Sequence, residues 1–174
     1  TLISGSTGVN KITDGTIVNA DIGSSAAIAT TKLGAGAVLQ VKIGYLTGVT
    51  TSSNSYSDSG LSVSITPSST SSKILADFGT MLYNNSTAEL AGGFQLVRDS
   101  TSVFDTGNHY IYDQGKDSNQ ATTDGGENIN YLDSPNTTSA VTYKIQVKSG
   151  TNGAAVKFLT KGHLTLMEIA GWVQ

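Results

Sequence analysis

The sequence predicts an all-β protein, with a jelly-roll-like β-sandwich head preceded by an extended, oligomeric fibrous neck. The first observation is the composition: 37% of the residues are hydrophobic, only 13% are charged, and 20 of 174 are glycine. Short strands joined by tight turns are typical of such a chain. The second is alternation over 141–147, where Val141, Tyr143, Ile145 and Val147 are separated by polar residues. This period of two places the apolar set on one face of a strand.

Residues 1–37 form the predicted neck, and residues 38–174 form the head. Apolar residues recur in the neck at intervals of five or six, at Ile12, Ile17, Ile22, Ile28 and Leu33. With this spacing the residues would not line up on one side of a strand or on one side of an α-helix. One chain could hardly cover side chains so sparse, so we predict that they mediate oligomerisation of identical copies wound around a common axis. The alternative is a loose N-terminal arm that lies on the head.

The head contains eight to ten predicted strands, with the spacing along the sequence that is typical of a two-sheet jelly roll. In the first, residues 38–46 alternate Leu39, Val41, Ile43 and Tyr45 with Gln40, Lys42 and Gly44. The others cover 61–65, 73–83, 93–98, 102–104, 109–113, 128–132, 140–147, 156–158 and 163–170. Segments 50–60 and 114–127 are predicted to be polar surface loops.

The closing strand, 163–170, carries apolar residues on both faces, which predicts a central strand that is covered on both sides. Glu168 lies within it. A buried carboxylate has a raised pKa unless it is paired, and Lys161, Lys144 or Arg98 could neutralise this one. We interpret Glu168 as structural, because the sequence places no second carboxylate beside it for catalysis.

Several function classes are disfavoured. The net charge is −3 and the basic residues are scattered, so we predict no nucleic-acid partner. The chain has no run of about 18 apolar residues, so we predict no insertion into a membrane. The chain has no cysteine, and its two histidines lack ligand spacing, so we predict no cofactor and no metal site. No nucleophile beside a base and no carboxylate pair is placed by sequence, so we predict no catalytic residues and no enzymatic activity.

A candidate binding site lies beside the polar loop 114–127. Tyrosine rings cover the apolar face of a sugar, while amides and carboxylates bind its hydroxyls. The residues that we assign to this site are His109, Tyr110, Tyr112, Asn128 and Tyr131. The alternative, which we favour, is that the rings pack at a rim or at a subunit interface.

Several strings occur in an order that resembles a known family. Residues 66–75 read TPSSTSSKIL, 96–101 read LVRDST, 132–136 read LDSPN, 142–143 read TY and 164–169 read LTLMEI. They resemble the C-terminal domains of tail-fibre-like structural proteins of tailed phages, especially marine and cyanobacterial ones. The neck strings ITDGTI at 12–17 and TKL at 31–33 resemble the repeat-like segment that often precedes such domains. The polar loop 114–127 matches no pattern of that family.

The resemblance implies a homotrimeric virion protein that projects from the particle and contacts the host surface. Its partners would then be copies of itself, other virion proteins and a host surface polysaccharide. The alternative within the virion is a capsid head fibre or decoration protein that does not bind a receptor. A polysaccharide-degrading enzyme is the third hypothesis, and it requires a cleft with two carboxylates.

Overall fold

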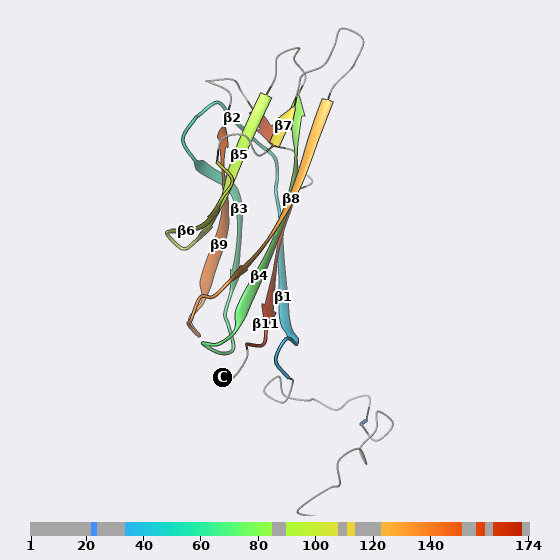
Figure 1. The fold of residues 1–174 in the computed structure, drawn as a ribbon, viewed down its shortest axis with the longest axis vertical. Helices are drawn as coiled ribbons and strands as arrows, with labels where there is room; N and C mark the ends of the chain where they lie inside the picture. Colours follow the sequence, from blue (N-terminus) through green and yellow to red (C-terminus); the bar gives the residue numbers. More distant parts are fainter. Residues whose placement is uncertain are drawn as a thin grey trace, which may run out of the picture. The chain divides into compact units, whose positions relative to one another are not determined.

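The computed structural model describes residues 22–23, 34–84, 90–107, 111–113, 123–150, 156–158 and 162–171 (Figure 1). The chain divides into two units, Thr1–Leu33 and Gly34–Gln174. Of the predicted oligomerisation residues, Ile12, Ile17, Ile28 and Leu33 lie outside the described residues, and Ile22 is exposed. The oligomeric neck therefore stays a prediction.

The second unit is a sandwich of two antiparallel sheets, which confirms the predicted all-β class. Sheet A contains β1 (Val38–Tyr45), β2 (Val49–Thr51), β4 (Lys73–Asn84), β8 (Thr123–Asp133), β10 (Val156–Phe158) and β11 (His163–Ile169). Sheet B contains β3 (Ser57–Ile65), β5 (Leu90–Arg98), β6 (Thr101–Asp105), β7 (Ile111–Asp113) and β9 (Val141–Ser149). Two predicted loops were too long: β2 and the start of β3 fall within 50–60, and β8 begins within 114–127.

Strand β11 lies between β1 and β4, so its predicted central position is confirmed. Strand β4 pairs along its other edge with the whole of β8. These registers align residues from four strands in rows across sheet A. One row is Val41–Met167–Leu75–Leu132, and another is Tyr45–His163–Gly79–Asn128.

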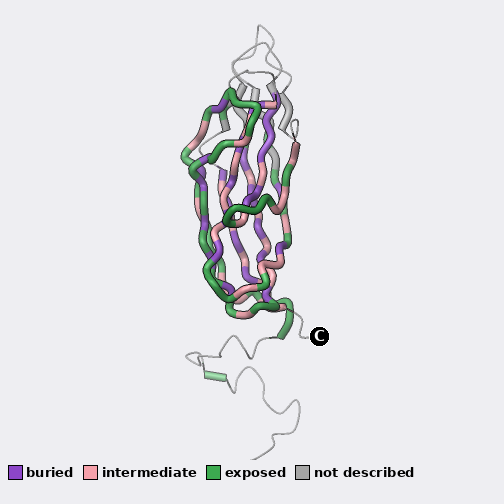
Figure 2. Tube along the Cα trace, turned by 90° about the vertical axis from the view of Figure 1, so that its left-hand side faces the viewer, coloured by how far each residue is buried: buried purple, intermediate pink, exposed green. Residues whose placement is uncertain are grey.

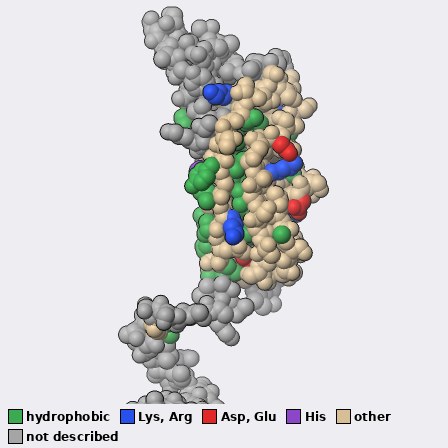
Figure 3. All heavy atoms as spheres, turned by 180° about the vertical axis from the view of Figure 1, so that it is seen from behind, with side chains coloured by type: hydrophobic (Ala, Val, Ile, Leu, Met, Phe, Trp, Pro, Cys, Tyr) green, Lys and Arg blue, Asp and Glu red, His purple; other side chains and the backbone are tan. Residues whose placement is uncertain are grey.

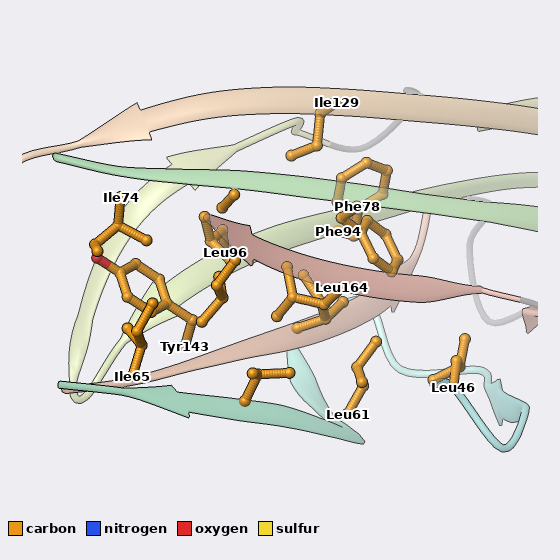
Figure 4. Packing of buried hydrophobic residues seen from close by; sticks show 14 of the residues in the cluster. Leu46, Leu61, Ile65, Ile74, Phe78, Phe94, Leu96, Ile129, Tyr143 and Leu164 are labelled. Carbon is orange, nitrogen blue, oxygen red and sulfur yellow. The ribbon is translucent and has the colours of Figure 1, made fainter. Parts of the chain in front are cut away.

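The core lies between the sheets, where β3, β4, β5, β8, β9 and β11 contribute inward-pointing residues (Figure 4). Buried and more exposed positions alternate along these strands (Figure 2). Phe78 of β4 meets Phe94 of β5 edge to face, with ring centroids 4.9 Å apart. Tyr143 of β9, in the strand with the clearest alternation, is fully buried. Strand β1 approaches β3 closely, because Gly44 has no side chain: a Cβ there would lie 2.8 Å from Val63.

Candidate functional site

The predicted receptor-binding residues are only partly described. His109 and Tyr110 lie outside the described residues. Tyr112 is in β7, where its backbone pairs with Ala91 of β5. Asn128 and Tyr131 are both in β8.

Asn128 and Tyr131 face opposite sides of β8, because they are three residues apart in a strand. Tyr131 points inward, and its ring lies 5.7 Å from that of Phe104 between centroids. Asn128 points outward and is exposed. These two side chains therefore do not share one binding surface. The receptor-binding assignment of the set stays a prediction.

Asn128 instead belongs to a polar cluster on the outer face of sheet A. Its Nδ2 donates to Asp77 Oδ1 at 2.7 Å, and Asn130 Nδ2 donates to Asn128 Oδ1 at 3.3 Å. His163 Nε2 lies 3.9 Å from Asp77 Oδ1. Gly79 leaves room for this arrangement, since a Cβ there would lie 3.1 Å from Asn128 Nδ2 and 3.3 Å from His163.

Tyr45 extends this cluster at the edge of the sheet, where it pairs with His163 and is 67% exposed. An exposed ring beside amide, carboxylate and imidazole groups could bind a hydroxyl-rich ligand. Sequence reasoning did not single out Tyr45 or Asp77 as site residues. These residues come together through the cross-strand register, which pairs strands that are far apart in the chain. Local alternation in the sequence does not reveal that register.

Glu168 is a buried carboxylate within a closed set of donors. Its Oε1 accepts hydrogen bonds from Ser68 N at 2.6 Å, Ser68 Oγ at 2.6 Å and Ser72 Oγ at 2.7 Å. Its Oε2 accepts from Gln40 Nε2 at 2.6 Å. Burial alone would raise the pKa of Glu168, but these hydrogen bonds outweigh burial and hold the pKa below its ordinary value.

The expected cationic neighbours of Glu168 are engaged elsewhere. Arg98 forms an ion pair with Asp133, and Lys144 forms one with Asp58 at 2.9 Å; Lys161 lies outside the described residues. Neutral hydroxyl, amide and backbone groups therefore replace the predicted ion pair.

Asp133 forms a second internal network. Its Oδ2 accepts from Arg98 Nη1 and, at 2.6 Å, from the hydroxyl of the buried Tyr143. Burial, and then the hydrogen bond to this carboxylate, raises the pKa of Tyr143 above its ordinary value. Tyr143 therefore stays protonated and acts as a hydrogen-bond donor. Both internal networks are structural, because their polar atoms are used up within the fold.

The outer face of sheet B is polar. Asp58 accepts from Gln146 Nε2 at 2.5 Å and from Lys144 Nζ at 3.0 Å. Beside them lies a shallow pocket of about 210 Å³, lined by Asp58, Gly60, Leu61, Ser62, Thr142, Lys144 and Ile145. The lining contains no aromatic ring to cover a sugar.

Within the described ranges, no three His, Cys, Asp or Glu side chains are grouped so that they could hold a metal ion. The same part of the chain includes no helix long and apolar enough to cross a membrane.

Comparison with known proteins adds a likeness in fold alone. The chain matches no protein family, and no curated protein is similar to it in sequence. Among solved structures, that of the infectious bursal disease virus Gx strain is similar, with 14% sequence identity and a TM-score of 0.37. The match covers 75% of this chain and 33% of that one, so the chain spans about a third of that protein's length.

Proposed function

We propose that this chain is a structural protein of a virion, and that its head belongs to a homotrimeric phage tail fibre that attaches to the host surface. The observation that carries the proposal is that the strings resembling tail-fibre proteins meet in space. Ser68 and Ser72 of TPSSTSSKIL hold Glu168 of LTLMEI. These hydrogen bonds join residues from different strings. They therefore support a resemblance in fold, and not only in the composition of the turns.

The remaining strings meet in the second network. Arg98 of LVRDST and Tyr143 of TY bind the same oxygen of Asp133, which belongs to LDSPN. Asp99, in the same turn as Arg98, accepts from the backbone N–H of Thr142 at 2.9 Å. All five strings therefore take part in holding one end of the sandwich together.

We assign host contact to the opposite end of the sandwich. Strand β4 ends there at Asn84, opposite Thr123 at the start of β8, and β7 pairs with the first residues of β5. The candidate residues His109 and Tyr110 immediately precede β7 in the chain. Attachment through three such ends on one axis would rely on avidity, since linked weak sites bind far more tightly than one. The proposal assigns no catalysis, cofactor or metal to the protein.

Immunogold labelling of intact particles of the phage that encodes the chain tests the location. Label on the tail is expected. Label on the capsid would overturn the tail-fibre assignment and favour a head fibre or decoration protein, and particles without label would overturn the virion assignment itself.

Binding of the fluorescently labelled full chain to cells of that phage's host tests attachment. We expect binding to fall at least about tenfold in the Tyr110→Ala/Tyr112→Ala variant and to be unchanged in Ser62→Ala, which alters an exposed residue of sheet B. Equal binding by all three proteins would remove the tyrosines from the proposed contact.

A further inference from the structure

The apolar side of β1 faces away from the core. Val41, Ile43 and Tyr45 alternate along the strand and are 53%, 51% and 67% exposed. A period-two pattern normally turns its apolar side toward a covered surface, while exposed strand positions are polar. In β1 it is Gln40 and Gly44 that face inward. The pattern therefore indicates a second surface that covers β1 from outside.

The orientation of β1 is fixed by its inward residues. Gln40 Nε2 donates to the buried Glu168 at 2.6 Å and to the backbone oxygen of Thr66 at 2.7 Å. Gly44 provides the space into which Val63 and Leu61 of β3 pack. Turning the strand over would remove a donor from Glu168 and place a large side chain against β3. The outward apolar side is thus a requirement of the fold.

One apolar row continues the exposed side of β1 across four strands of sheet A, beside the rows that contain the polar cluster. Val41 stands in one row with Met167, Leu75 and Leu132, and Leu132 at the far edge is 57% exposed. We define the apolar patch as Val41, Ile43, Tyr45, Leu75, Leu132 and Met167. Figure 3 shows hydrophobic side chains gathered along the side of the sandwich that sheet A forms. Strand β11, predicted to be covered on both sides, is covered by sheet B on one side only.

Sheet B provides an internal comparison, because its outer face follows the ordinary rule. The residues facing outward from β3 and β9 include Ser62, Ser64, Thr142, Lys144 and Gln146. The apolar residues exposed on sheet A therefore do not simply reflect the overall amino-acid composition of the chain. These described strands of sheet B expose polar side chains, whereas sheet A exposes an apolar row beside its polar cluster.

We propose that the outer face of sheet A is the surface through which copies of this chain contact one another; this rests on the self-association proposed above. Four residues of the apolar patch, Val41, Ile43, Tyr45 and Leu132, are more than half exposed. The fully buried core of a protein interface is richer in apolar side chains and poorer in charge than the rest of a protein surface. The patch therefore has the composition that the core of a specific interface requires.

Charge and connectivity favour a second copy over an unrelated partner. The described charged groups of this face are Lys73 and Asp77, which bind Ser134 and Asn128, and Lys157 of β10, which lies away from the apolar patch beside Tyr83. A face with few charges can meet the same face of other copies around a common axis without strong like-charge repulsion. In addition, Leu33, the last residue to which we assign oligomerisation, lies five positions before β1 begins. Joining copies through that segment would raise the effective concentration of one patch for another.

Thiol labelling of the full chain tests the proposal, since the chain has no cysteine of its own. Ile43→Cys places a thiol in the apolar patch, and Ser62→Cys places one on the outer face of sheet B as the matched control. We expect maleimide to label Ile43→Cys at least about tenfold more slowly than Ser62→Cys at high protein concentration. Denaturant should abolish the difference. Leu132→Cys should be protected to the same extent if the contact spans the sheet.

The mass of the same samples, measured by light scattering, separates the possible outcomes. Protection at residue 43 together with an oligomeric mass is the result we expect. Protection in a monomer would overturn the proposal, because the chain's own residues 1–33 or another ligand would then cover the patch. An oligomer in which both thiols react equally fast would overturn the assignment of this face while leaving self-association intact. A monomer without protection would contradict both proposals.

Discussion

Glu168 and Asp133 stand in one cross-strand row of sheet A, on either side of Ile74, and both carboxylates point inward. Two buried carboxylates so close in a sheet would be costly without partners. Each is satisfied by a different turn: Glu168 by the serines of the β3–β4 turn, and Asp133 by Arg98 before the β5–β6 turn. This row therefore ties the turns at one end of the sandwich to its central strands.

Glu168→Ala should lower the free energy of unfolding by about 2–4 kcal/mol, because several buried donors lose their acceptor. Urea unfolding followed by tryptophan fluorescence or circular dichroism measures the change. Asp58→Ala is the control: Asp58 pairs with Lys144 at the exposed surface, where an ion pair contributes at most about 1 kcal/mol. Equal effects of the two substitutions would contradict the structural role of Glu168.

Acid should destabilise the wild-type head through Glu168. Its pKa is held below the ordinary value of 4.5 in the folded protein. A carboxyl group of this kind stabilises the fold fully above its unfolded pKa, and the contribution is lost as the pH falls through the lower folded pKa. The difference in stability between wild type and Glu168→Gln should therefore shrink as the pH is lowered from 6 toward that range. A difference independent of pH would argue against the ionised form. Asp58 and Asp105 also have lowered pKa values, but both proteins share them, so they cancel in the comparison.

Tyr143→Phe should cost about 1–3 kcal/mol, because it removes a hydrogen bond to a charged, buried oxygen. Arg98→Ala should cost a similar amount, and the two should be non-additive since both groups bind Asp133 Oδ2. A double-mutant cycle by urea unfolding measures the coupling. Coupling within about 0.3 kcal/mol of zero would show that the two donors act independently.

Val41→Lys/Ile43→Lys should weaken self-association at least about tenfold, because it places two charges in the apolar patch. Ser64→Lys/Ser62→Lys adds the same two charges, with the same spacing, to the exposed edge strand β3 of sheet B and should leave association unchanged. Sedimentation over a range of concentrations measures both variants. Unfolding curves check that each remains folded, as expected for lysine on an edge strand.

Local patterns predicted much of the fold, because they depend on neighbouring residues. Alternation in Val141, Tyr143, Ile145 and Val147 located β9 and its buried face. Apolar residues on both sides of 163–170 placed β11 centrally. The same reasoning did not reveal that β1 presents its apolar side to the exterior, since alternation does not say which face meets the core.

The cross-strand register determines the features of the candidate site that local sequence patterns did not predict. Asp77, Asn128 and His163 meet because β8, β4 and β11 are adjacent, although 86 positions separate the first from the last. Likewise, the sequence predicts a cationic partner for Glu168, but Gln40 of β1 and the serines Ser68 and Ser72 of the β3–β4 turn bind it instead. Turn serines look interchangeable in a sequence, and only the folded arrangement distinguishes those that bind a carboxylate.

Self-association is the claim on which the fibre account and the assignment of sheet A both depend. Light scattering of the intact chain at high concentration measures it most directly. We predict a mass of three times 17.9 kDa. A mass of 17.9 kDa, unchanged as the concentration rises, would contradict the account.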